Sequence, residues 1–89
     1  MKIIFTEHAM FEMERRQITK DDLKDLIDQP QQKIPGKKSR VILQKKYFDK
    51  LIKKEMLLRV IGKQEHGKFV VITTYKTSRI EKYWLKGEN

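Results

Sequence analysis

Hydrophobic positions are densest between residues 56 and 76, where two runs of branched and aromatic residues flank a short polar segment. Runs of this composition on either side of a glycine-containing break predict an antiparallel hairpin. The simplest register places residues 65–67 in a three-residue loop, with Gly67 in the left-handed conformation that such loops need. We expect the rest of the chain to pack around this hairpin.

The same register divides the hairpin into two faces, because successive side chains of a strand point to opposite sides. One face is almost wholly apolar and is expected to meet helices: Met56, Leu58, Val60, Val70, Ile72 and Thr74. The other face is mixed: Leu57, Arg59, Ile61, Val71, Thr73 and Tyr75. On the mixed face Arg59 would lie opposite Thr73, with Tyr75 on the diagonal at roughly 7–8 Å.

Two short helices are predicted ahead of the hairpin. Thr6 is a suitable N-cap for a helix over residues 7–16. Thr19 repeats this signal for a helix over residues 20–28, which stops before Pro30. In the first helix we expect one stripe of side chains to be buried: Ala9, Met10 and Met13. Three charged side chains are expected to face outward: Glu12, Glu14 and Arg15.

The remaining segments complete one domain over residues 1–89. Their predicted structures are an edge strand over 2–5, a type II turn at Pro35-Gly36, a half-buried strand over 39–48, and a strand or short helix over 79–85. Two helices followed by at least three antiparallel strands, with no linker or repeat, predict an α+β class: two N-terminal helices packed on a small antiparallel sheet.

Length and composition exclude several kinds of protein. A chain of 89 residues builds one modest core. The absence of cysteine excludes disulfides and thiolate chemistry, and two histidines argue against a structural zinc site. We therefore expect no metal and no cofactor. No apolar run is long enough to span a membrane, and residues 1–5 are too short for a secretory signal, so we expect a cytoplasmic protein without a membrane partner.

The positive charge is concentrated in one part of the chain. Residues 37–59 contain nine Lys and Arg against two acidic residues, a net charge of +7, whereas residues 1–30 have a net charge of −2. Such a block suggests a polyanion partner, and we expect RNA phosphates to contact Lys37, Lys38, Arg40, Lys45, Lys46, Lys53 and Lys54. The alternative is a solvated lysine-rich surface.

Four residues are candidates for chemistry on RNA: His8, Arg59, Tyr75 and Arg79. Arg59 lies in an apolar strand and needs an acceptor, either a phosphate or a carboxylate of Glu12, Glu14 or Glu81. The positive end of the first helix would keep His8 neutral and able to accept a proton. The alternative for His8 is a hydrogen bond that ties the start of the helix to the sheet. Tyr75 is expected on the face of Arg59. Arg79 would neighbour Tyr83 if that segment is helical.

Several short motifs carry a resemblance to a known family. They are Phe5-Thr6-Glu7-His8-Ala9, Met13, Arg16, Ile18, Thr19, Pro30 and Thr73-Thr74-Tyr75. Together they resemble a bacterial domain of unknown function numbered 4258, over about the whole chain. The chain departs from the pattern at Glu12, where members often have arginine, and at Gln17, where they often have glycine.

That family is similar to the RelE/ParE toxin superfamily and to BrnT-like toxins. The resemblance implies a RelE-like module that binds RNA or the ribosome, is blocked by an antitoxin protein, and acts as a metal-independent endoribonuclease. Two other interpretations stand beside it: a non-catalytic nucleic-acid or ribosome-binding module, and a protein-interaction module.

Overall fold

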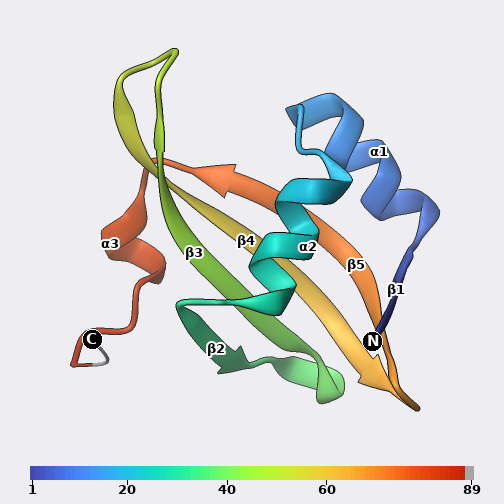
Figure 1. Ribbon diagram of the computed structural model, residues 1–89. Helices are drawn as coiled ribbons and strands as arrows, with labels where there is room; N and C mark the ends of the chain where they lie inside the picture. The colour runs from blue at the N-terminus through green and yellow to red at the C-terminus, as the bar shows by residue number, and fades with distance from the viewer. Residues whose placement is uncertain (88–89) are drawn as a thin grey trace.

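The structure, a computed structural model, describes residues 1–87 and contains one twisted sheet with two helices against one face (Figure 1). Its elements are β1 (Lys2–Phe5), α1 (Glu7–Arg16), α2 (Lys20–Asp28), β2 (Gln32–Pro35), the 3-10 turn η1 (Lys37–Ser39), β3 (Val41–Asp49), β4 (Lys54–Glu65), β5 (Lys68–Thr77) and α3 (Ile80–Tyr83). The strand order is β1-β5-β4-β3-β2, with β1 parallel to β5 and all other neighbours antiparallel. The predicted α+β class is confirmed.

The two helices begin and end at the residues that the capping signals indicate. The Thr6 hydroxyl accepts a hydrogen bond from the backbone of Ala9 at 3.0 Å and donates one to the Ile72 carbonyl at 3.1 Å. This second bond ties the start of α1 to β5. Thr19 and Asp22 form a reciprocal capping box at the start of α2. At the end of α1, Gln17 is left-handed with φ 56°, a conformation that favours glycine.

The core lies between the two helices and the sheet. Its fully enclosed members include Ala9, Leu23, Leu26, Val60, Phe69 and Val71. The predicted burial stripe of α1 is partly wrong. Met10 is 45% exposed, while Glu12, predicted to face outward, is only 8% exposed. Glu12 is buried because Arg15 and Arg16 of the same helix fold over its carboxylate.

The hairpin between β4 and β5 turns in two residues, not in the predicted three. His66 and Gly67 both have positive φ, 45° and 77°, as a type I′ turn requires, and Glu65 therefore faces Lys68. Gly67 is left-handed as predicted. The three-residue loop failed because His66 adopts a conformation that its residue type does not signal.

A bulge in β5 then changes which side chains share a face. Ile61 pairs with Thr73 and Gly62 with Val71, so Ile72 has no partner on β4. Before the bulge Phe69 and Val71 pack in the helix-facing core. Val70 and Ile72, predicted there, do not belong to it, so the predicted faces are wrong in this half of the hairpin. The predicted pairing is wrong along the whole hairpin, because Arg59 pairs with Tyr75 and not with Thr73. Beyond the bulge Leu58, Val60 and Thr74 lie on the predicted face.

Gly62 permits the packing of Phe69 on the opposite strand. A β-carbon at position 62 would overlap the Phe69 ring and press against the Val70 carbonyl. The ring therefore lies where only a glycine leaves room for it. This close approach connects the end of β4 to the core beneath the helices.

The segment between α2 and β3, for which only a turn was predicted, contains the edge strand β2. Gln32 pairs with Gln44, and Ile34 with Ile42. The predicted type II turn is wrong, because Gly36 is extended with φ −108° and the positive φ angles fall at Lys38 and Ser39. Within residues 1–87, no helix has the length and hydrophobicity needed to span a membrane.

Candidate functional site

The face of the sheet opposite the helices is partly covered by α3 and the residues that follow it. Two buried glutamines hold this segment in place. Gln44 Nε2 donates to the Tyr83 carbonyl at 3.1 Å and to Gln32 Oε1 at 2.6 Å. Gln32 Nε2 donates to the Leu85 carbonyl at 3.0 Å, and its Oε1 accepts from the Leu85 backbone. Polar side chains therefore join the C-terminal segment to the sheet here.

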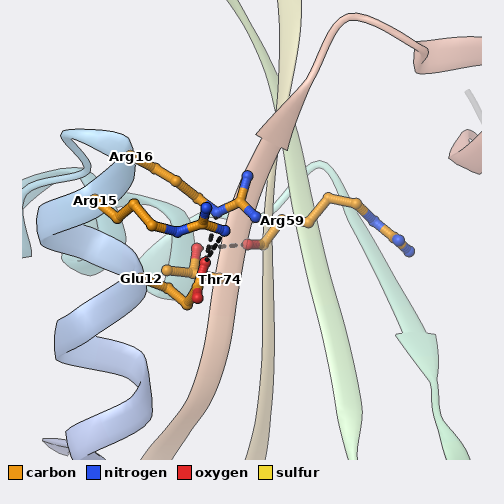
Figure 2. A network of polar contacts seen from close by, with 5 residues as sticks. All are labelled: Glu12, Arg15, Arg16, Arg59 and Thr74. Carbon is orange, nitrogen blue, oxygen red and sulfur yellow. Dashed lines mark hydrogen bonds and ion pairs between the residues drawn. The ribbon is translucent and has the colours of Figure 1, made fainter.

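Arg59 lies in the middle of this polar network. It is 7% exposed, and its Nε donates to Gln44 Oε1 at 2.8 Å. Its Nη1 donates to the Tyr75 hydroxyl, because the bulge brings Tyr75 directly opposite Arg59. The guanidinium carbon lies 4.2 Å from the centroid of the Tyr83 ring. Figure 2 shows this side chain extending away from α1, on the far side of the sheet, while the Arg59 carbonyl accepts from the Thr74 hydroxyl at 2.6 Å.

No carboxylate neutralises Arg59 in the part of the chain that the structure describes. The ion pairs there join Glu12 to Arg15 and Arg16, and Lys63 to Glu65. The salt bridge considered for Arg59 with Glu12, Glu14 or Glu81 is therefore not formed. Its terminal Nη2 has no hydrogen-bond partner and is not among the fully buried unpaired atoms, so this edge of the guanidinium reaches solvent.

Other cations lie against the aromatic rings of the same region. Lys46 Nζ is 4.1 Å from the Trp84 ring centroid, and Lys82 Nζ is 5.3 Å from that of Tyr83. The guanidinium of Arg16 is 6.0 Å from the Tyr75 ring, which packs edge-on against Tyr83 at 6.1 Å between centroids. We call this surface the cation–aromatic face and define it by Arg16, Lys46, Arg59, Tyr75, Lys82, Tyr83 and Trp84.

Glu12 sets the position of Arg16. Its Oε1 accepts from Arg16 Nε at 2.7 Å and from Arg15 Nη2 at 3.1 Å, as Figure 2 shows. The hydrogen bond from Arg16, reinforced by the one from Arg15, lowers the pKa of the Glu12 carboxyl. A residue that departs from the resembled pattern thus anchors two arginines at the end of α1 nearest Tyr75.

The two tyrosines differ in acidity. Burial raises the pKa of Tyr75, against the opposing hydrogen bond from Arg59. A hydrogen bond with Tyr75 lowers the pKa of Tyr83, and the charges of Lys82 and Arg59 lower it further. Of the two hydroxyls, that of Tyr83 is therefore the more readily ionised.

The structure brings together two of the four residues predicted for chemistry. Arg59 and Tyr75 are in contact. Arg79 is exposed at the start of α3 and lines a shallow hollow with Lys46, Glu55 and Glu81. His8 is exposed in the first turn of α1, about 12 Å along the helix from Arg16, and has no bond to the other three.

The basic block of residues 37–54 does not form one surface. Lys37, Lys38 and Arg40 lie at one end of β3, and Lys53 and Lys54 at the other, about 30 Å away (Figure 1). Lys45 and Lys46 point to opposite faces of the sheet: Lys45 lines a cavity under α2, and Lys46 lies on the cation–aromatic face. Of the seven predicted RNA contacts, only Lys46 lies beside Arg59's network.

Sequence patterns did not single out Gln44 or Trp84 as part of this site. Nothing in the alternating pattern of a half-buried strand signals that Gln44 will be fully buried. Tyr83 carried a usable signal, because it was expected to neighbour Arg79 if that segment is helical. Its place in the site depends on α3 folding back over the sheet.

Among residues 1–87 there is no group of three or more His, Cys, Asp or Glu residues that could hold a metal ion.

Comparison with known proteins identifies the family and no more. The chain matches no curated protein and no solved structure at a significant level. Residues 5–76 match a family described as a domain of unknown function, DUF4258; this stretch includes Arg59 and Tyr75 and ends before Tyr83. Because the match covers most of the chain, the protein belongs to the DUF4258 family.

Proposed function

We propose that this protein is a toxin-like RNA-binding protein whose cation–aromatic face holds single-stranded RNA, with a phosphate bound at the open edge of Arg59. The observation that carries the proposal is a buried guanidinium held only by the neutral acceptors Gln44 and Tyr75. Burying a cation without a countercharge is unfavourable, and a phosphate oxygen at Nη2 would supply one.

The neighbouring rings and cations support the choice of single-stranded RNA. Tyr75, Tyr83 and Trp84 are partly exposed, and each has a cation beside it. Proteins that bind single strands combine cations along the backbone with aromatic rings on which bases stack. The formal net charge of +9 favours association with any polyanion, and this face adds an arginine without an ion pair beside aromatic rings on which bases can stack.

Fluorescence anisotropy with a labelled single-stranded RNA, at several salt concentrations, tests this proposal. Arg59→Gln should weaken binding by about tenfold, because the charge-assisted contact is lost. Lys46→Gln should reduce the slope of log K against log salt by about 0.7, the value for one single-strand phosphate contact. Lys24→Gln makes the same charge change on exposed α2, on the helix side, and serves as the control. Equal affinities for Arg59→Gln and Lys24→Gln would exclude this face as the binding site.

Metal-independent cleavage of the bound RNA is a second proposal, favoured by the lowered pKa of Tyr83 beside Arg59. Tyr83, as the phenolate, would accept the proton of a 2′-hydroxyl while the oxygen of that hydroxyl attacks the phosphorus. The bond from phosphorus to the 5′-oxygen breaks, a water molecule protonates the leaving 5′-oxygen, and a 2′,3′-cyclic phosphate remains. Arg59 would stabilise the developing negative charge, with Tyr75 and Arg79 orienting the phosphate. His8 is the alternative proton acceptor.

Cleavage is tested with RNA in the presence of a chelator and with RNA that carries one 2′-deoxynucleotide at the cut site. The proposal requires that the unmodified RNA gives cyclic-phosphate ends in the presence of the chelator and that the RNA with the 2′-deoxynucleotide is not cut. Tyr83→Phe should abolish cleavage if Tyr83 is the base, whereas His8→Gln should do so if histidine is. Loss of cleavage in neither variant would remove both assignments.

Membership of the RelE/ParE toxin superfamily, and an antitoxin partner, belong to the same proposal. Their support is the order of elements, in which two helices precede the four antiparallel strands β2 to β5, together with the positive charge of the cation–aromatic face. An acidic segment of an antitoxin would cover that face. Purification from the native host at several salt concentrations tests it: recovery of this chain alone at every salt concentration would contradict it.

A further inference from the structure

A cavity of about 230 Å³ lies on the other side of the sheet, between α2 and strands β3, β4 and β5. It is far larger than the roughly 30 Å³ that one water occupies in the liquid, and so has room for a small organic molecule. Leu58 forms part of its floor, and Ile18 and Leu26 are apolar residues on the helical side. It belongs to neither the cation–aromatic face nor the proposed RNA path.

The hydroxyl of Tyr47 is unsatisfied in this cavity. It is fully buried and is the one such side-chain atom without a hydrogen-bond partner within residues 1–87. A buried hydroxyl without a partner is unfavourable by about 1–3 kcal/mol, and such atoms in native proteins usually have an unseen partner. Because the hydroxyl is covered, a ligand in the cavity reaches it only after a small movement of the cavity wall, and it then supplies the missing hydrogen bond.

Opposite charges face each other across the cavity without touching. Lys45 and Lys76 flank Leu58 in register on the sheet, about 10 Å apart. Asp22 and Asp25 of α2 line the helical side. Neither lysine forms an ion pair with either aspartate, since all ion pairs among residues 1–87 lie elsewhere. Asp22 Oδ2 accepts the capping bond from the Thr19 backbone, which leaves its Oδ1 for a ligand. Two lysines on the sheet therefore face Asp25 and the second oxygen of Asp22 on the helical side.

We infer that this cavity binds a small zwitterion with an apolar side chain, a free aliphatic α-amino acid. Its ammonium group is positioned to bind Asp22 and Asp25, and its carboxylate to bind Lys45 or Lys76. Its side chain lies on Leu58, Leu26 and Ile18, and the Tyr47 hydroxyl gains a hydrogen bond. An aliphatic amino acid meets all three features of the site: separated charges, an apolar floor and one free hydroxyl.

Titration of the isotope-labelled protein with L-leucine, followed by NMR, tests the inference. Saturable shifts are expected at Leu58 and Ile18. Leucinamide lacks the carboxylate and 4-methylpentanoate lacks the ammonium, so each should bind at least about tenfold more weakly than L-leucine. Equal binding of either analogue, or no saturable shift with L-leucine up to its solubility, would overturn the inference.

Matched variants locate the binding. Lys45→Gln and Tyr47→Phe should weaken L-leucine binding by about fivefold each, because each removes one polar contact. Lys46→Gln makes the same charge change on the opposite face of the same strand and should bind as the wild type does. If L-leucine binds all of these variants equally, the cavity is not its site. In the absence of L-leucine, Tyr47→Phe should raise the melting temperature, which separates loss of a ligand contact from loss of folding.

Discussion

The two faces of the sheet are closed by different kinds of interaction. The face beneath α1 and α2 is closed by apolar side chains such as Leu23, Val60 and Phe69, which are excluded from water but need no specific partner. The opposite face is closed by Gln44 and Arg59, which are buried only because each has hydrogen-bond partners. An apolar face supplies stability in proportion to its buried area, whereas a polar face fixes geometry and leaves chemical groups available.

The largest effect that distinguishes the faces should come from truncating the apolar core. Leu23→Ala removes a fully buried side chain and leaves a cavity, which should lower the free energy of unfolding by about 2–5 kcal/mol. On the other face, Gln44→Leu keeps the size but leaves Arg59 Nε and the Tyr83 carbonyl without a partner, a cost of about 1–3 kcal/mol. Urea denaturation of both variants measures the difference. A larger loss in Gln44→Leu would reverse this ranking of the two faces.

Gly62→Ala tests how tightly the apolar face is packed. The added β-carbon would overlap the Phe69 ring, and the strands must shift to admit it. We expect a loss of about 1–3 kcal/mol by thermal or chemical denaturation. Lys63→Ala, at the next residue of the same strand, is the control for a change in strand propensity. Similar small losses in both variants would show that Phe69 moves aside without cost.

Glu12 forms a polar network within the helical layer, and its contribution to the stability of the fold should depend on pH. Its folded-state pKa is lowered from the ordinary value of 4.5 by the hydrogen bonds from Arg16 and Arg15. A carboxyl with a lowered pKa stabilises the fold above its unfolded pKa, and this contribution is lost as the pH falls through the folded value. Glu12→Gln should therefore be less stable than the wild type near neutral pH. The difference should shrink as the pH falls below 4.5 and disappear below the lowered pKa of the folded state. A constant difference at all pH values would mean that Glu12 acts through packing alone.

The sequence predicts the elements that depend on local signals. Both helices lie where Thr6 and Thr19 place them, because a cap acts on the residues next to it. The alternation of β3, with Leu43 toward the helices and Gln44 away, is also local. The hairpin register is not, because it depends on a left-handed His66 and on a bulge at Ile72, neither of which has a residue-type signature.

The candidate site was predictable only in part for the same reason. Arg59 and Tyr75 were expected on one face, and the structure places them in contact because the two-residue turn and the bulge each shift the pairing by one residue. The contributions of Gln44 and Tyr83 come from α3 folding back over the sheet, an arrangement between segments about 40 residues apart. The split of the basic block follows from β3, whose alternation sends Lys45 and Lys46 to opposite faces.

The central claim is that the charge of Arg59 is free to bind an anion from outside, and Gln44→Glu tests it most directly. Gln44 Oε1 lies 2.8 Å from Arg59 Nε, so the change places a carboxylate oxygen at hydrogen-bond distance from Arg59 Nε. Arg59 itself is not changed. The internal carboxylate would compete with RNA phosphate for the same cation. Gln64→Glu adds the same charge at an exposed position at the end of β4 and controls for overall repulsion. The account predicts that Gln44→Glu, folded as judged by its melting temperature, binds single-stranded RNA at least about tenfold more weakly than Gln64→Glu. Equal affinity of the two folded variants would contradict it.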